Sequence, residues 1–134
     1  MSGCLRSSKP IHRAEPTLIV KCQAALRSSL PSDYVRFLLR MNGGEGFVGK
    51  HNLMAWRVED LISSNKECKI DDSVAALFLF GSDGGGEAFA FDTRSTPPPI
   101  VVVPFIGMDF QDTKLIAPNF DSFLQFLYRS EYLF

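Results

Sequence analysis

The chain has 134 residues, a length typical of a single domain that can bury its own hydrophobic core. Hydrophobic residues make up 46% of the sequence and include 12 phenylalanines, so we expect aromatic packing to dominate that core. The net charge is only −1, which argues against the basic domain that nucleic-acid binding requires, and we expect no nucleic-acid partner.

Residues 1–15 are predicted to form a mobile N-terminal arm, and residues 16–134 a single folded domain. The first segment mixes serine, glycine, proline and basic residues without hydrophobic periodicity. No apolar run follows its basic residues, so the pattern of a secretory signal is missing. No apolar stretch reaches the roughly 18 residues that a membrane span needs. We therefore expect a cytoplasmic protein without membrane attachment.

Two amphipathic helices are expected after the arm. The first begins near Pro16 and ends near residues 28–29, on the helical spacing of its apolar side chains. In the second, within residues 30–44, one apolar face is formed by side chains three and four positions apart, namely Tyr34, Phe37, Leu38 and Met41. Asn42 and Gly43 can adopt the left-handed conformation that ends a helix.

The middle of the chain predicts shorter elements. Residues 47–56 indicate a loop followed by a strand, and residues 58–65 indicate a short helix. Glu59 and Asp60 favour the N-terminal turn of that helix, because acidic side chains are stabilised at the positive end of the helix dipole. Residues 66–73 are predicted to be a polar connection.

Three strands and a final helix follow. Residues 76–80 are apolar at every position, which is typical of a strand covered on both faces. Residues 87–92 resume after a glycine-rich loop and predict a hairpin, and residues 100–103 are a third buried strand bounded by prolines. An amphipathic helix that begins near Asn119 should cover the sheet. We predict the α+β class, with a mostly antiparallel or mixed sheet of about four to six strands flanked by about three to four helices.

No catalytic, cofactor or metal site is expected from the motifs. The loop from Gly81 to Glu87 is glycine-rich, but no Lys–Ser/Thr pair follows it and the next residues resemble a strand, so a tight turn is favoured over a phosphate-binding loop. His12 and His51 are the only histidines, and the cysteines form no CxxC pair. The acidic residues around the loop follow no calcium-binding or paired-carboxylate spacing, and we interpret them as a solvated acidic rim that would also serve as a docking surface: Asp83, Glu87, Asp92, Asp109 and Asp112.

Charge is distributed unevenly along the chain. Residues 1–50 carry eight Lys or Arg against three Asp or Glu, whereas residues 51–134 carry six against twelve. The resulting balances of +5 and −6 could steer a charged partner, although solvated surface charge explains them as well.

Three blocks of sequence, in this order and spacing, resemble the SUKH superfamily, in particular its branch named after fungal cell-wall-assembly regulators. The first runs from Leu30-Pro31-Ser32-Asp33-Tyr34 to Gly46, the second from Phe80 to Asp92, and the third from Phe120 to Leu127. The resemblance implies an α+β domain without enzymatic activity. It also implies binding to another protein, in bacteria commonly as an immunity protein that blocks a toxin, and in fungal members as a regulatory scaffold.

We therefore predict a SUKH-like immunity protein that neutralises a cognate bacterial toxin by direct binding, with a non-enzymatic regulatory scaffold or adaptor as the alternative. A small enzyme would require His51 or a buried carboxylate pair to line a cleft. The glycine loops let a partner approach the backbone, and nearby acids supply charge, so the predicted partner-binding residues are Glu45, Asp83, Glu87, Asp92, Asn42, Gly43, Gly44, Gly84, Gly85 and Gly86. Helix termination and turn formation are the competing explanation for the glycines.

Overall fold

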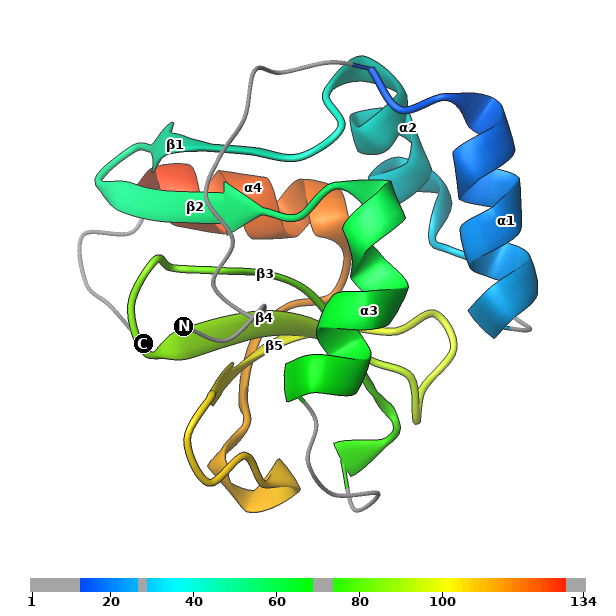
Figure 1. Ribbon diagram of the computed structural model, residues 1–134. Coiled ribbons are helices and arrows are strands. Elements are labelled where there is room, and N and C mark those ends of the chain that lie inside the picture. The colour runs from blue at the N-terminus through cyan, green and yellow to red at the C-terminus, as the bar shows by residue number, and fades with distance from the viewer. Residues whose placement is uncertain (1–12, 27–28, 69–73, 130–134) are drawn as a thin grey trace.

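The computed structural model describes residues 13–26, 29–68 and 74–129, which form a six-stranded antiparallel sheet with four α-helices around it (Figure 1). In chain order the elements are α1 (Pro16–Leu26), α2 (Ser32–Arg40), β1 (Gly44–Val48), β2 (His51–Ala55), α3 (Val58–Cys68), β3 (Leu77–Ser82), β4 (Glu87–Asp92), β5 (Ile100–Pro104), the short 3-10 helix η2 (Phe110–Asp112), β6 (Lys114–Ala117) and α4 (Phe120–Arg129).

The strands follow one another in the sheet in the order of the sequence, and each neighbouring pair is antiparallel. Helix α4 lies against one face of the sheet, with α2 next to it, whereas α3 crosses the other face and packs against α1 (Figure 1). The predicted α+β class and the mostly antiparallel sheet are therefore confirmed. The helices predicted near residues 30–44, 58–65 and 119 onward are present, as are the three central strands.

Two strands were not predicted. The strand predicted within residues 47–56 is β2, but it forms a hairpin with an unpredicted strand at residues 44–48, and residues 114–117 add a second unpredicted strand at the far edge of the sheet. The first strand, Gly44–Val48, contains glycine at alternate positions, so it lacks the apolar alternation that marks a strand. The second has only four residues, too few to show any periodicity.

The predicted arm reaches the edge of the described part of the chain. Residues 1–12 lie outside the described residues, and so do residues 27–28, near which the first helix was predicted to end. Ala14 is buried, and its backbone N–H donates a hydrogen bond to the carbonyl of Leu38 at 2.8 Å. The segment just before α1 is thus packed against α2.

A cluster of aromatic rings fills the space between the sheet, α2 and α4. Tyr34 of α2 is 1% exposed, and its ring centroid lies 5.2 Å from that of Phe91 and 5.1 Å from that of Phe120. Phe80 lies at the centre, with its ring centroid at most 6.4 Å from those of five other buried rings, Tyr34, Phe89, Phe91, Phe120 and Phe123. Tilted and edge-on ring pairs of this kind add to the stabilisation that comes from area burial alone.

Asp33 joins the N-terminal ends of α2 and α4. One of its carboxylate oxygens accepts a hydrogen bond from the N–H of Tyr34 at 2.9 Å. The other accepts from the N–H groups of Phe120 at 2.9 Å and Asp121 at 3.1 Å, which are first-turn donors without an intrahelical partner. The negative charge also favours the positive end of the α4 dipole. This carboxylate accounts for the aspartate in the Leu-Pro-Ser-Asp-Tyr block.

The strand β2 pairs with only the last two residues of β3, and β3 has an irregular register where this pairing ends. It pairs with β3 only through Met54 and Ala55, after which the N–H of Trp56 donates to the carbonyl of Phe80 at 2.9 Å and the chain turns into α3. The pairing of β3 with β4 shifts register at this point, so Phe80 is the extra residue of a β-bulge. The bulge places the ring of Phe80 in the aromatic cluster.

Beyond the short pairing with β2, the side chain of Asn65 in α3 forms the hydrogen bonds to β3 that a neighbouring strand would otherwise form. Its side-chain carbonyl accepts from the N–H of Leu79 at 2.8 Å, and its side-chain NH₂ donates to the carbonyls of Leu79 at 2.9 Å and Leu61 at 2.8 Å. The side chain is 6% exposed, so these backbone groups would otherwise be buried without partners.

Replacing Asp33 should remove the bonds that it makes to α4. We expect Asp33→Ala to lower the free energy of unfolding by about 1–2 kcal/mol, the usual effect of losing a side-chain helix cap. The neighbouring Ser32 makes no capping bond, and Ser32→Ala should change stability by less than about 0.5 kcal/mol. Urea denaturation of both variants measures the difference, and equal stabilities would contradict the role given to Asp33.

Replacing Asn65 should lower the free energy of unfolding more than replacing Asp33 does. Asn65→Leu keeps the branching of the side chain at Cγ but leaves the N–H and carbonyl of Leu79 unpaired, so we expect a loss of about 2–5 kcal/mol in the free energy of unfolding. The exposed Lys66 on the same helix provides the control, since Lys66→Ala should stay within about 0.5 kcal/mol of the wild type. A small effect of Asn65→Leu in guanidinium denaturation would show that the sheet does not depend on this amide.

Candidate protein-binding surface

The predicted turn between β3 and β4 is built by one aspartate. Asp83 accepts hydrogen bonds through one carboxylate oxygen from the N–H of Gly85 at 2.8 Å and from the N–H of Glu87 at 3.3 Å. Its own N–H donates to the carbonyl of Glu87 at 3.1 Å, and the side-chain amide of Asn52 donates to its carbonyl at 3.3 Å. The turn is thus fixed internally and tied to β2.

The three glycines of this turn have different environments. Gly84 has φ of +84°, and a Cβ there would collide with the side chain of Asn52, so only glycine fits. Gly85 and Gly86 are exposed, and the carbonyl of Gly86 accepts from the N–H of Phe105 at 2.9 Å. A Cβ added to Gly86 would have nothing within 4 Å of it, so the surroundings of this residue are open to a partner.

Glu87 starts β4 and lines a shallow hollow of about 290 Å³ together with Gln111, Asp112, Thr113 and Lys114. Partial burial raises the pKa of the Glu87 carboxyl, the charge of Asp83 raises it further, and Lys114 lowers it. Asp83, Glu87 and Asp112 therefore lie at the same end of the sheet, with Lys114 among them.

Glu45 belongs to the same end of the sheet. In the registers of β1, β2 and β3 it lies opposite Met54, which in turn lies opposite Ser82 at the start of the turn. The next pair in β1 and β2 joins Phe47 to Asn52, the residue that bonds the turn. We call the residues Glu45, Asp83, Glu87 and Asp112 the acidic end.

Asp92 lies at the opposite end of β4 and is not part of the acidic end. It is five positions from Glu87 in the sequence, which corresponds to about 17 Å along a strand. Its carboxylate is held by the guanidinium of Arg94, with one contact at 2.7 Å and another at 2.9 Å, and Arg94 also lies 4.0 Å above the ring of Phe110. Hydrogen bonding to Arg94 lowers the pKa of Asp92, in spite of burial.

Asn42, Gly43 and Gly44, the residues predicted for the first glycine loop, connect α2, β1 and α3. Asn42 is 6% exposed; its side-chain carbonyl accepts from the N–H of Val58 at 2.8 Å, and its NH₂ donates to Glu59 at 2.6 Å. It therefore caps α3, which is a role that its predicted function in ending α2 did not include. Gly43 has φ of +79°, and a Cβ there would lie 2.6 Å from the carbonyl oxygen of Ala55. Gly44, half-buried with φ of 133°, starts β1.

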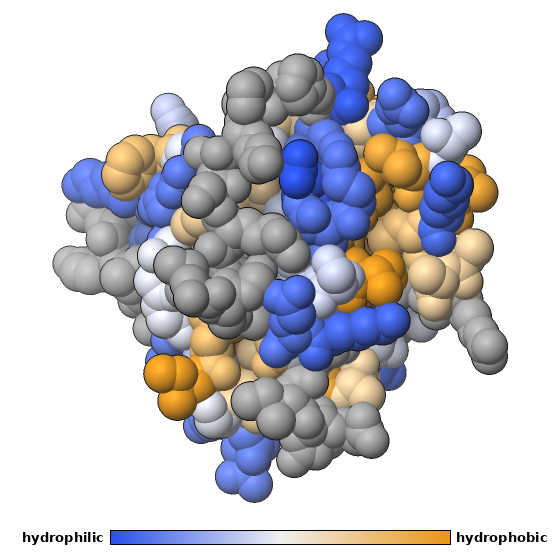
Figure 2. All heavy atoms as spheres, in the orientation of Figure 1, coloured by the Kyte–Doolittle hydropathy of each residue, from blue (hydrophilic) through white to orange (hydrophobic). Residues whose placement is uncertain are grey.

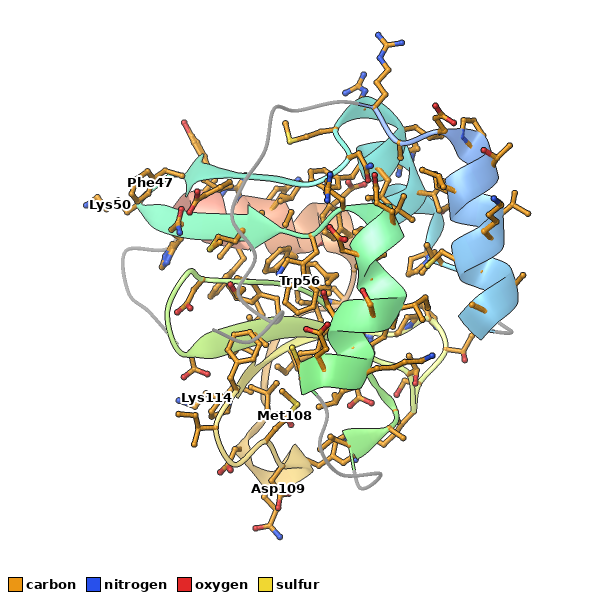
Figure 3. All side chains as sticks on the ribbon, viewed as in Figure 1. Phe47, Lys50, Trp56, Met108, Asp109 and Lys114 are labelled. Atoms are coloured by element: carbon orange, nitrogen blue, oxygen red, sulfur yellow. The ribbon has the colours of Figure 1, made fainter. Side chains whose placement is uncertain are left out.

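Several exposed apolar side chains were not predicted as contact residues. Phe47 is 77% exposed, and Figure 3 shows it projecting with Lys50 at the outer end of the β1–β2 hairpin, on the side of the molecule that also carries Lys114. Figure 2 shows hydrophobic residues gathered over α1, where Val20 is exposed, and hydrophilic residues over α3. An aromatic side chain next to glycines is a sequence signal that could have identified Phe47.

The other reactive side chains are placed as follows. Cys22 is buried in α1, and burial raises its pKa to about 11, which keeps the thiol protonated near neutral pH. His51 is buried in β2 and lines none of the three hollows described, which have volumes of about 290, 410 and 480 Å³. The described residues contain no group of three or more His, Cys, Asp or Glu side chains arranged to hold a metal ion. None of their helices is both long and apolar enough to cross a membrane.

Comparison with known families agrees with the resemblance seen in the sequence. The family described as SMI1 / KNR4 family (SUKH-1) matches residues 13–125, from the segment that packs on α2 into the second turn of α4. No curated protein matches the sequence significantly.

The contact between Asp92 and Arg94 should make stability depend on pH. Because the folded protein holds the pKa of Asp92 below its usual value, the pair stabilises the fold above about pH 4, and this contribution is lost as the pH falls through the lowered pKa. Arg94→Gln should therefore reduce the free energy of unfolding at neutral pH, with a difference from the wild type that shrinks in acid.

Urea denaturation between about pH 2 and pH 7 measures this difference. Arg36→Gln, which breaks an exposed pair with Asp121, serves as the control and should change stability by less than about 1 kcal/mol. A loss in Arg94→Gln that stays constant across the range would show that the ring contact with Phe110, and not the ion pair, stabilises this corner.

Proposed function

The chain belongs to the SMI1 / KNR4 family (SUKH-1), and on this basis we propose that it is an immunity protein that neutralises a toxin by direct contact. In this proposal the domain acts by binding and has no catalytic activity. The observation that carries it is the acidic end, an exposed, internally braced surface of the kind that suits recognition of a basic protein.

The charges of the acidic end favour a basic partner. Glu45 and Asp112 are exposed, and Asp83 and Glu87 are partly exposed, so all four carboxylates reach the solvent. Lys114, and Lys50 at the outer end of the β1–β2 hairpin, offset part of this charge, but the four acids outnumber them. Complementary charge of this kind speeds association and selects partners more than it adds affinity.

Rigidity of the surface also supports the proposal. Asp83 holds the turn with bonds to Gly85 and Glu87, and Asn52 ties the turn to the neighbouring strand. A fixed surface loses little conformational freedom on binding, which is one route to high affinity. Stable neutralisation would need an interface of roughly 1,600 Å² and a Kd near nanomolar, or about −12 kcal/mol.

The exposed ring of Phe47 supplies an apolar contact next to the acids. Aromatic side chains are enriched among the residues that dominate binding energy, and those residues are usually surrounded by polar groups. Phe47 lies in β1 two residues from Glu45, so the two side chains project on the same face of the strand.

Co-expression tests the proposal directly. A toxin encoded by a gene next to this one should arrest growth when expressed alone, and the wild-type chain should restore growth and co-purify with the toxin. If no neighbouring gene product is toxic, bound or neutralised, the proposal is wrong. A neighbour that binds without being toxic would instead favour a regulatory scaffold.

Charge reversal at the acidic end should slow binding to that toxin. We expect Glu87→Lys combined with Asp112→Lys to lower the association rate by about tenfold at low salt, with a smaller effect at high salt, because steering is screened by ions. Glu15→Lys is the matched control, since Glu15 is an exposed acid directly before α1, and Figure 1 shows α1 on the side of the molecule away from the outer end of the β1–β2 hairpin. Surface plasmon resonance at two salt concentrations separates the rates, and equal rates for both variants would place the interface elsewhere.

A further inference from the structure

The two edges of the sheet are protected differently. The edge at β6 starts with Lys114, shows a shift of register against β5, and is followed by Pro118, three features that discourage the pairing of another strand. The edge at β1 has neither lysine nor proline within the strand, and its register with β2 is continuous from Gly44 to Val48.

The residues of β1 are accessible to solvent, although α4 contacts this strand and Tyr128 of α4 packs against Gly49 in the turn that follows it. Each of the five residues of β1 is exposed or half-buried, and within residues 13–26, 29–68 and 74–129 no strand pairs with its outer side. The hairpin between β1 and β2 has a two-residue turn, Gly49 and Lys50, so the flanking pair of Val48 and His51 exchanges hydrogen bonds. Because such pairs alternate along an antiparallel ladder, Glu45 and Phe47 direct their N–H and carbonyl groups outward.

The side chains of β1 define what a further strand would meet. On one face stand Glu45, whose side chain has no ion pair or hydrogen bond among the described residues, and Phe47, which is 77% exposed. On the other face lies Gly46, where nothing is within 4 Å of the position of a Cβ. An added strand would therefore find one acid, one ring and free space for bulky side chains.

We propose that β1 is a docking edge for an extended segment of a basic partner protein, which adds to the sheet as an antiparallel strand. Such addition gains affinity from main-chain hydrogen bonds and specificity from alternate side chains. The segment places a basic residue across from Glu45, a β-branched or aromatic residue across from Phe47, and a large residue across from Gly46. This inference rests on the proposed function in one respect, that the chain acts by binding a protein.

The charge of Glu45 disfavours the pairing of β1 with the β1 strand of a second copy of this chain. Two β1 strands paired antiparallel about Gly46 would place Glu45 opposite Phe47 and leave both acids without a basic partner. A register that brings Glu45 opposite Glu45 would oppose like charges, which is unfavourable. A partner strand with a lysine or arginine opposite Glu45 forms an ion pair with this acid, which a second copy of β1 cannot do.

A designed peptide provides the probe, acetyl-Thr-Val-Tyr-Lys-Tyr-Thr-amide, in which Val, Tyr and Lys face Phe47, Gly46 and Glu45 in the antiparallel register. Titration into the full chain should shift backbone NMR signals of β1 and β2. The amide protons of Glu45 and Phe47 should become protected from exchange, whereas that of Gly46, already bonded to β2, should change little. Replacing the peptide's Lys by Glu should weaken binding by at least about threefold.

Variants at Phe47 isolate the backbone donor. Phe47→Pro removes the outward N–H without removing a bond to β2, and Phe47→Thr removes the ring but keeps the N–H. We expect the proline variant to bind the peptide about threefold to tenfold more weakly than the threonine variant, the effect of one lost backbone hydrogen bond. Thermal unfolding of both variants checks that the hairpin is intact.

Three results would overturn the inference: no binding of the peptide, equal binding by Phe47→Pro and Phe47→Thr, or shifts centred on β6. A dimer of the chain that Phe47→Pro dissociates, seen by sedimentation equilibrium, would assign the edge to a second copy and also overturn it. If the toxin of the co-expression test binds Phe47→Pro as tightly as Phe47→Thr, this inference fails and the proposed function stands. If no toxin binds but the peptide does, the proposed function fails and the edge remains a docking site.

Discussion

The bidentate contact between Asn65 and the backbone of Leu79 ties α3 to β3 at the point where β2 leaves the sheet. Where β2 turns away into α3, the edge of β3 would otherwise be buried with unpaired polar groups. The amide of Asn65 satisfies them, and the bulge at Phe80 then directs a large ring into the aromatic cluster. The hairpin of β1 and β2 can therefore pair with β3 through Met54 and Ala55 alone while the centre of the sheet remains buried. The register of this hairpin brings Glu45 level with Ser82, next to the turn that carries Asp83, and so completes the acidic end.

Much of the fold follows from patterns that are local in sequence. The apolar stripe of α2, the continuous apolar run of β3 and the spacing of α4 each specify an element without reference to the rest of the chain. The strands β1 and β6 were missed because the first alternates glycine with other residues and the second is four residues long. Asn65 gives no local signal either, since its partner Leu79 lies 14 positions away and across the sheet.

The candidate surface was predicted in part. Asp83, Gly84 to Gly86 and Glu87 form a turn as expected, and the register brings Glu45 beside it. Asn42 and Gly43 instead serve the junction of α2, β1 and α3, and Asp92 is paired with Arg94 at the far end of β4. Sequence alone does not separate these roles, because glycine and short polar residues suit both tight turns and exposed contact loops. Only the register of the strands assigns each acid to one end of the sheet.

The junction at Asn42 affects how fast a partner strand can associate with β1. One side chain caps α3 from the end of α2, and Gly43 packs against the backbone where β2 ends, so the root of β1 is clamped on two sides. A partner therefore meets an edge whose direction is set before the encounter. Only the incoming segment then loses conformational entropy when the added strand forms. Association does not have to wait for β1 to reach its bound conformation.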